Sequence, residues 1–506
     1  MNGQVAYEPS WRHYASKLGP LWLVLGSLLA GVVAASHYGT ILLVIAAGLA
    51  VAFAIARISP GVLSGVLIVA IANGVPFVNF NSYVVEGKFR PSDVLFFILF
   101  AVLAHWSLST PEARAYRMPR WLLWPCVALF VWWTFTLLRT FLFDGVPLVR
   151  GMLFGRDFLY FTIALPLFVR ALQSGREILA MLATLFAGAS LYAVAQITDQ
   201  LFNWNGSWVI HSNLLTEFGG ITRFYTAMTE IVIVTFALGL GLAFLAGRLW
   251  VRMVGPTLAV LCGVSLAINL TRAIYVALTV GVIVISILWF FGRELRFVRF
   301  RRALGVVVVV VSLVFIPSAM LGVNLIPHQI SGVVGQRIQI SFTEVRAQTG
   351  DFGYRVQLYD EMWHLLGKRW PIGLGFWHPA SKPVPELPNQ SIRNGDVGLM
   401  NGVMTMGVLG TLLIYLPVVG TLFLVLSHRG RGHEEDAWAG YGAGVWIVAA
   451  IVGSITMTTL FSLEGLLVTA AVLAAVVRLI ELDAQEEEEE EAAQFEAPAA
   501  LPAPAR

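Results

Sequence analysis

The sequence predicts an all-α polytopic membrane protein with about 12–14 transmembrane helices, at about 20 apolar residues per span, and one large, partly helical loop outside the membrane. Its 506 residues are 58% hydrophobic and only 12% charged, with a mean hydropathy of +0.76. A soluble domain has about 25% charged residues. This composition therefore excludes a soluble globular enzyme, and its apolar content excludes a disordered chain.

Apolar runs along the chain mark the candidate spans in order. They lie near residues 20–36, 40–56, 61–78, 94–108, 121–143, 157–171, 178–196, 224–247, 254–270, 273–291, 303–323, 397–426, 439–458 and 463–480. The first run resembles a signal peptide, but a second run follows at once, so we interpret it as an uncleaved anchor. The two cysteines, Cys126 and Cys262, lie inside apolar runs and predict neither a disulfide nor a metal site.

The short connections carry arginine on alternate sides, which predicts the orientation by the positive-inside rule. With the N-terminus inside, the cytoplasmic set is Arg57, Arg114, Arg117, Arg120, Arg170, Arg176, Arg248, Arg252, Arg293, Arg296, Arg299, Arg301, Arg302, Arg429 and Arg431. This arrangement places both termini in the cytoplasm. It also places one long segment, residues 324–396, outside, where its length predicts structure of its own.

These features divide the chain into five parts. Residues 1–19 form a cytoplasmic N-terminus, 20–323 a helix bundle, 324–396 the outer loop and 397–480 the last transmembrane helices. Residues 481–506 contain nine acidic residues and one arginine, a net charge of −8, which leaves +11 for residues 1–480 and explains the formal charge of +3. We expect this acidic tail to be a disordered, solvated extension.

The outer loop contains one clear helical pattern. Val356, Tyr359, Trp363 and Leu366 recur at helical spacing over residues 354–367, and Gly367 is a suitable end. We expect an amphipathic helix that lies on the membrane or on the bundle. The following Pro371-Ile372-Gly373-Leu374-Gly375-Phe376 predicts a tight turn, and Asn394-Gly395-Asp396 a second turn before the next span.

Several of these residues resemble motifs of the O-antigen ligase and polymerase superfamily of bacterial envelope enzymes. The resemblance covers residues 215–426 and rests on the order of its motifs. These are Arg223 before a span, Thr271-Arg272-Ala273 at the start of a helix, Arg355 followed by Trp363 in the amphipathic helix, the proline–glycine turn at 371–376, and the return to the membrane over 396–410, which ends at Gly407-Val408-Leu409-Gly410. Ligases usually have a His-Asn pair where this chain has Asp396-Val397, which favours a polymerase.

The resemblance implies an inverting glycosyltransferase that works without a metal ion or cofactor at the periplasmic face of the inner membrane. It would transfer or polymerise glycan from an undecaprenyl-pyrophosphate carrier to a glycan or lipid acceptor, beside other envelope polysaccharide assembly proteins and without nucleic acid. Arg272, Arg355 and Arg223 are the candidate pyrophosphate ligands, because guanidinium groups bind phosphates in bidentate fashion. Asp396 is the candidate base. Snorkelling of the arginines and capping by Asp396 are the alternative interpretations.

Other polar residues have plainer interpretations. Asp360 and His364 lie four residues apart on one helix face, where a surface pair is favoured over a metal site. Glu230 lies just inside a span and is either a buried partner for an arginine or a residue facing water. Arg150 and Arg156 line an acceptor groove or anchor the chain at the interface.

A second class of function is a polysaccharide or lipid-linked sugar transporter or flippase, and a third is a non-catalytic envelope scaffold. A transporter should carry charges in the middle of its spans and paired broken helices. The spans of this chain are nearly free of charge at their centres, and the polar residues gather at the outer edge and in the long loop. This distribution favours an enzyme that works at the outer face.

Overall fold

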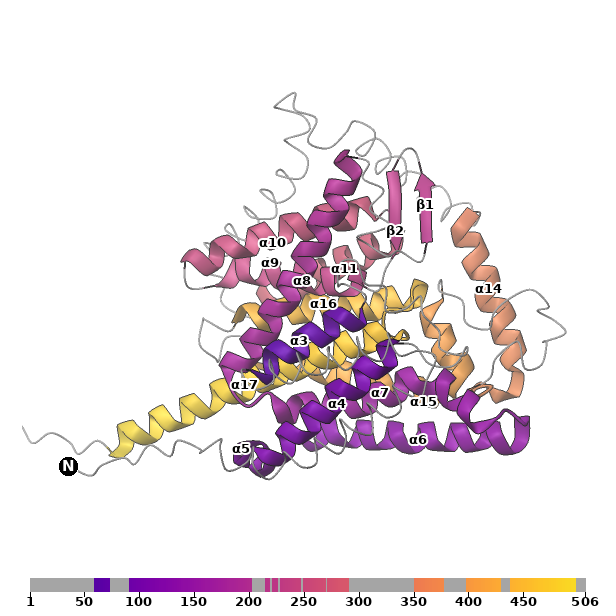
Figure 1. Cartoon of the computed structure of the whole chain (residues 1–506), viewed down its shortest axis with the longest axis horizontal. Helices are drawn as coiled ribbons and strands as arrows, with labels where there is room; N and C mark the ends of the chain where they lie inside the picture. Colours follow the sequence, from indigo (N-terminus) through magenta and orange to yellow (C-terminus); the bar gives the residue numbers. More distant parts are fainter. Residues whose placement is uncertain are drawn as a thin grey trace, which may run out of the picture. The chain divides into compact units, whose positions relative to one another are not determined.

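The computed structural model describes ten stretches of the chain. These are residues 59–72, 91–202, 214–218, 221–225, 228–246, 249–269, 271–290, 350–376, 397–428 and 437–496. They form a helical bundle with one short β-hairpin (Figure 1). The all-helical class predicted from the sequence is confirmed, and the hairpin is the one addition within these stretches.

Seven of the described helices are long and apolar enough to cross a membrane. They are α6 (Arg120–Asp144), α7 (Leu148–Ala171), α8 (Gly175–Phe202), α9 (Met228–Leu245), α15 (Gly398–His428), α16 (Ala437–Thr456) and α17 (Leu463–Glu496). Four more helices have shorter apolar segments: α3 (Pro60–Ile71), α4 (Pro91–Ser109), α10 (Leu249–Ile268) and α11 (Arg272–Phe290). Each coincides with a predicted run, whereas the runs near 20–36, 40–56 and 303–323 lie outside the described residues.

The helices of the bundle differ in how much protein surrounds them. α9 and α17 are central, because 89% of the residues in their most apolar stretches are buried inside the protein. α6 is peripheral, because only 33% of the corresponding residues are buried. α9 packs on α10 and α16, α17 packs on α7, and α6 packs on α7 and α15. α9 and α16 approach closely at Gly241, where a Cβ would lie 2.1 Å from the carbonyl oxygen of Trp438. Small residues of this kind allow membrane helices to pack backbone to backbone.

Arg478 ties the last helix to the bundle. The exposed fraction of this residue is only 2%. Its Nε donates to the carbonyl oxygen of Leu172 at 3.1 Å, its Nη1 to Glu481 at 2.7 Å and its Nη2 to Gln173 at 3.1 Å. The ring of Tyr116, which follows α5 (Pro111–Ala115), lies against the guanidinium group. A buried guanidinium group is stable only with such partners.

The acidic tail differs from the expected disordered extension. α17 continues through the glutamate run to Glu496, and residues 497–506 lie outside the described part of the chain. Glutamate is a good helix former, so a helix that is already nucleated in the bundle can propagate through such a run.

The hairpin lies between α8 and α9. β1 (Leu214–Phe218) pairs antiparallel with β2 (Ile221–Tyr225), with Thr216 opposite Arg223. Gly219 and Gly220 separate the strands in the sequence, and such a glycine pair suits a two-residue hairpin turn.

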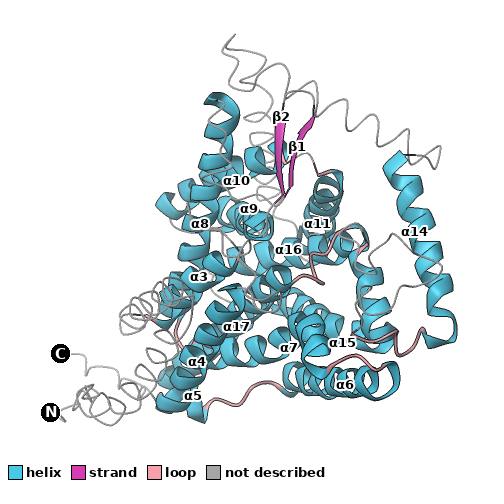
Figure 2. Cartoon of the chain, turned by 45° about the vertical axis from the view of Figure 1, so that its right-hand side comes forward, coloured by secondary structure: helices cyan, strands magenta, loops and turns pink. Residues whose placement is uncertain are grey.

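Among the described residues, several irregular segments gather at one end of the bundle, which we call the α14 end. It holds α14 (Gly350–Leu366) with the short η2 (Gly367–Arg369), the α6–α7, α10–α11 and α16–α17 connections and the starts of α9 and α15. Figures 1 and 2 both show α14 lying across the direction of α6 and not alongside it. The amphipathic helix predicted over 354–367 is therefore present, and its bounds differ by a few residues.

Candidate functional site

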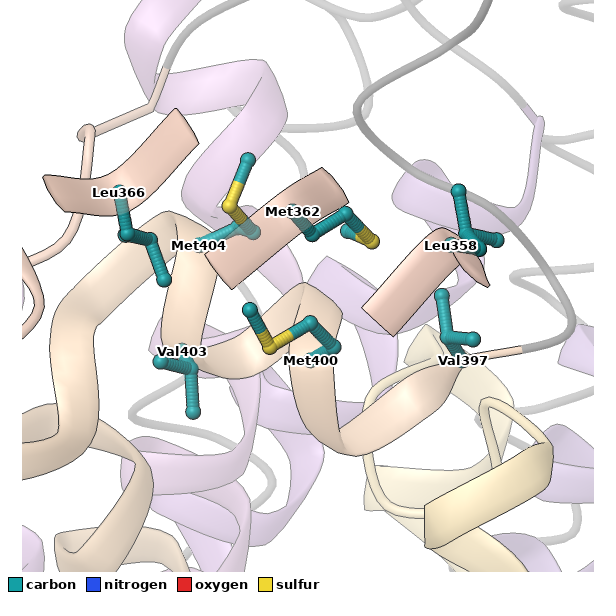
Figure 3. Packing of buried hydrophobic residues seen from close by; sticks show 7 residues of the cluster. All are labelled: Leu358, Met362, Leu366, Val397, Met400, Val403 and Met404. Atoms are coloured by element: carbon teal, nitrogen blue, oxygen red, sulfur yellow. The ribbon is translucent and has the colours of Figure 1, made fainter. Parts of the chain in front are cut away.

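α14 is held on the bundle by an apolar cluster that it shares with the start of α15. Its seven buried members are Leu358, Met362, Leu366, Val397, Met400, Val403 and Met404 (Figure 3). The first three recur at four-residue spacing on one face of α14. Beside them, the Tyr359 hydroxyl donates to the carbonyl oxygen of Ile455, and burial raises the pKa of this hydroxyl to about 12.

α15 is broken near its start at Gly407. The backbone there has φ 73° and ψ 176°, which is not helical and favours glycine. The break separates a short helical segment, residues 398–406, from the long remainder of α15. Backbone groups on both sides of such a break lose their helical partners, and in a membrane they must be satisfied by protein.

The proline–glycine turn supplies these partners. The amides of Leu374 and Gly375 donate to the carbonyl oxygens of Met404 and Thr405 at 2.6 and 3.0 Å. In return, the amides of Val408 and Leu409 donate to the carbonyl oxygens of Trp370 and Pro371 at 3.0 and 3.3 Å. The turn therefore fills the break in α15 and continues its backbone hydrogen bonding.

α6 holds both the turn and the break through side chains. Trp132 Nε1 donates to the carbonyl oxygen of Met406 at 2.8 Å. Arg139 Nη1 donates to the carbonyl oxygen of Ile372 at 2.9 Å, and the Thr140 hydroxyl accepts the amide of Phe376 at 3.0 Å. Arg139 Nη2 is buried and has no hydrogen-bond partner within the described residues.

The hydrogen bonds of the turn determine whether its backbone amides are free to bind an anion. The amides of Ile372 and Gly373 donate to the carbonyl oxygen of Arg369, and those of residues 374–376 donate as described above. Every amide from Ile372 to Phe376 is thus committed to a protein acceptor. An anion-binding turn needs free amides, so this turn positions other parts and does not itself cradle a phosphate.

A second polar group lies at the start of α9. Glu230 is 7% exposed and Asn269, at the end of α10, is 1% exposed. Asn269 Nδ2 donates to the Thr229 hydroxyl at 3.1 Å, and Thr459 of the α16–α17 connection lies close to the Glu230 carboxyl group. Glu230 Oε2, Asn269 Oδ1 and Thr459 Oγ1 have no hydrogen-bond partner in the described part of the chain. Most buried polar atoms in proteins have a hydrogen-bond partner.

The α16–α17 connection joins the two polar regions. Thr459 faces Glu230, while the neighbouring Phe461 ring lies so close to Gly402 of α15 that a Cβ there would be 2.2 Å from it. The start of α9 and the broken start of α15 therefore contact the same short connection.

Of the predicted site residues, Arg355 lies on α14, which packs against the start of α15. Arg355 is half-buried on α14, one turn before the buried Leu358. Asp396 lies outside the described residues, but its neighbour Val397 is fully buried in the cluster that contains Leu358. The segments that carry Arg355 and Asp396 are thus brought together.

For Arg272 and Arg223, the structure gives the position of the backbone. Arg272 is the first residue of α11, three residues after the buried Asn269 and next to the buried Thr271. A helix start favours an anion because its amides point outward. Arg223 lies in β2 opposite Thr216, and β2 contacts α8 and α10.

The remaining candidates have structural partners. Arg156 Nη1 pairs with Asp93 at 2.6 Å, and the Tyr160 hydroxyl donates to the same carboxyl group at 3.4 Å, so Arg156 joins α7 to α4. Asp360 and His364 form the expected exposed pair at 3.5 Å. Within the described residues, no group of three His, Cys, Asp or Glu side chains could hold a metal ion.

Sequence reasoning missed Trp132, Arg139 and Thr140. With Thr136, they form a polar stripe at spacings of three to four residues on an otherwise apolar helix. A stripe of this kind on a membrane span signals a face that contacts protein, and it was the available clue.

Residues 257–415 match the family model Wzy_C, described as O-antigen ligase, and this range covers Arg272, α11, α14, the glycine turn and the broken start of α15. A search of curated proteins gives no match. The fold and the match together identify a multi-pass membrane protein whose residues 257–415 resemble the O-antigen ligase family, Wzy_C.

Proposed function

We propose that this protein is a membrane-embedded inverting glycosyltransferase. It transfers or polymerises glycan from an undecaprenyl-pyrophosphate carrier, as an O-antigen or exopolysaccharide polymerase or as an O-antigen ligase. The observation that carries the proposal is the coincidence of the family match with the α14 end, since residues 257–415 include Arg272, Arg355 and Asp396. We place this end at the periplasmic face and both termini in the cytoplasm, following the arginines of the short loops.

The proposed reaction is a single displacement. The hydroxyl oxygen of the acceptor forms a bond to the anomeric carbon, and the bond from that carbon to the pyrophosphate oxygen breaks with inversion. The hydroxyl proton passes to a base, for which Asp396 is the candidate. The leaving undecaprenyl pyrophosphate carries the developing negative charge, and Arg272, Arg355 and Arg223 are proposed to bind it. These arginines supply the positive charge that a metal ion would supply in other transferases.

The broken helix favours this proposal over a transporter. In transporters, the freed backbone groups of broken helices bind the substrate or ion. Here the groups around Gly407 bond to Trp370, Pro371, Leu374 and Gly375 and to the Trp132 side chain. The break is therefore filled by the protein, which suits a fixed scaffold beside a site at the membrane edge.

Substitution of the two arginines inside the matched region tests the proposal. We expect Arg272→Ala and Arg355→Ala to abolish formation of the surface glycan in cells that lack the native gene. Arg170→Ala is the matched control, because Arg170 is exposed at the opposite end of α7. Protein amounts are compared by immunoblot, and full glycan synthesis by both variants would refute the pyrophosphate role.

The same cells distinguish the two reactions. Short chains in place of long ones would indicate a polymerase, whereas intact polymer that is not joined to lipid A core would indicate a ligase. Metal independence is tested with purified protein in nanodiscs and lipid-linked donor extracted from the deletion strain. Transfer should continue in excess EDTA, and a loss that Mg²⁺ restores would overturn the metal-free mechanism.

A further inference from the structure

α14 has more apolar surface than its contact with the bundle uses. Leu358, Met362 and Leu366 are at most 4% exposed, because they pack against α15. Val356 and Trp363 are 46% and 51% exposed. They are seven residues apart, and at 100° per residue they form a second line of apolar side chains beside the buried face.

The rest of the exposed helix surface is mainly polar, apart from Tyr354, which is 43% exposed. Gln357, Asp360, Glu361 and His364 are all exposed, and the side chains of Asp360 and His364 are 73% and 78% exposed. α14 therefore has three faces around its axis: one that packs on α15, one exposed apolar strip and one exposed polar face. Such a three-part helix fits a boundary between protein, lipid and water.

The end of α6, next to η2, also has exposed apolar side chains. Arg369, at the end of η2, lies 3.8 Å from Asp144 at the end of α6, and Arg139 holds the turn that follows. On α6, Phe141, Leu142 and Phe143 are 45%, 66% and 82% exposed, and Trp370 is 46% exposed. α6 is long and apolar enough to span a membrane, and about two thirds of the residues in its most apolar stretch are not buried in the protein. The exposed surface of α6 beside η2 is therefore one that lipid can cover.

We propose that Val356 and Trp363, together with Trp370, lie in the bilayer at the boundary between the headgroups and the acyl chains. α14 is then an interfacial helix, with one face on α15 and the neighbouring strip in lipid. The chemistry of the strip supports lipid as its occupant. Tryptophan is enriched at this depth, and the adjoining Lys368 and Arg369 can extend their charged ends to headgroup phosphates. Figures 1 and 2 show α14 running at a steep angle to α6, which also suits a helix in the membrane plane.

This placement fixes the depth of Arg355. Arg355 lies on the same helix as the strip, one residue from Val356, and is half-buried. A helix anchored at the headgroup boundary keeps this guanidinium group at the depth where the pyrophosphate of a lipid carrier lies. This consequence rests on the proposed function, whereas the lipid contact itself does not.

Spin labels on the two exposed faces of α14 test the contact. The labelled variants are Val356→Cys and, as the matched control, His364→Cys, which is two turns along the same helix on the polar face. The background has Cys126 and Cys262 replaced by alanine; both are buried, with 3% and 0% exposed. The full-length protein is placed in phosphatidylcholine–phosphatidylglycerol nanodiscs.

Collision rates with oxygen, which concentrates in lipid, and with a water-soluble nickel chelate are then measured. We expect the ratio of oxygen to nickel collisions to be several-fold higher at position 356 than at 364. Equal ratios would overturn the proposal, and protection of position 356 from both reagents would replace lipid by protein as the occupant. Because the readout is not enzymatic, its result is independent of whether the arginine variants abolish transfer.

Discussion

Substitution of Gly407 by alanine tests whether the turn at 371–376 and the break in α15 form one unit. The backbone of Gly407 lies in a region that L-residues rarely adopt, at a cost of about 1–3 kcal/mol. An alanine Cβ would also lie 2.2 Å from the carbonyl oxygen of Pro371 and 2.5 Å from the amide nitrogen of Ile372. These are backbone atoms that cannot rotate away, so the turn has to leave the break.

The magnitude follows from the bonds that would be lost. The hydrogen bonds from Val408 and Leu409 to Trp370 and Pro371 are the nearest to the clash, and each contributes about 1 kcal/mol net. Together with the backbone strain, we expect Gly407→Ala to lower the free energy of unfolding by about 3–5 kcal/mol.

Gly145→Ala is the control. Gly145 also has a positive φ, of 67°, and lies at the same end of the bundle, but a Cβ there would meet nothing within 4 Å. Its cost is the left-handed backbone alone, about 1–2 kcal/mol. Unfolding of purified protein in mixed micelles with rising dodecyl sulfate, followed by tryptophan fluorescence, measures both variants. A Gly407→Ala effect no larger than that of Gly145→Ala would refute the coupling of turn and break.

Two further predictions concern side chains at the α14 end. Trp132→Phe removes the indole donor to the carbonyl oxygen of Met406 and should lower the free energy of unfolding by about 1–3 kcal/mol. Trp124, which is 64% exposed, gives the control, and Trp124→Phe should change this free energy little in the same assay. Equal effects of the two substitutions would contradict the role of the Trp132 indole. The pKa of Tyr359 is raised by burial from 10 to about 12, so its folded state favours the protonated hydroxyl, and its contribution to stability should be complete below pH 10 and lost as the pH rises toward 12. The stability difference between the native protein and Tyr359→Phe, measured from pH 8 to 12, should shrink over this interval, and a constant difference would argue against the bond to Ile455.

Local signals in the sequence predicted much of the fold. Apolar runs located the described spans, because lipid requires about 20 consecutive apolar residues. The end of α14 at Leu366 followed from Gly367, and the turn at 371–376 followed from its proline and glycines. Each of these features depends on residues that are close together in the chain.

The partners of these features were not predictable in the same way. Gly407 is noted in the sequence only as part of the return to the membrane over 396–410, and nothing adjacent indicates that residues 370–375 bond across it. Trp132 likewise reads as a residue that faces lipid. The site residues were predictable only as far as their local sequence allowed. Arg355 and Glu230 stand out in the sequence as charges near spans. The burial of Glu230 beside Asn269 and Thr459 depends on three segments that are far apart in the chain.

The fixed backbone at Phe376 and Val397 has an evolutionary consequence. Both residues are fully buried, and they bound the 20 residues numbered 377–396. A chain between two fixed points can lengthen at little entropic cost, about 0.6 kcal/mol for each doubling of its length. Insertions and exchanges in this interval can therefore accumulate without loosening either anchor. Sequence changes there leave the contact between α14 and α15 in place, and Asp396 stays one peptide bond from the buried Val397.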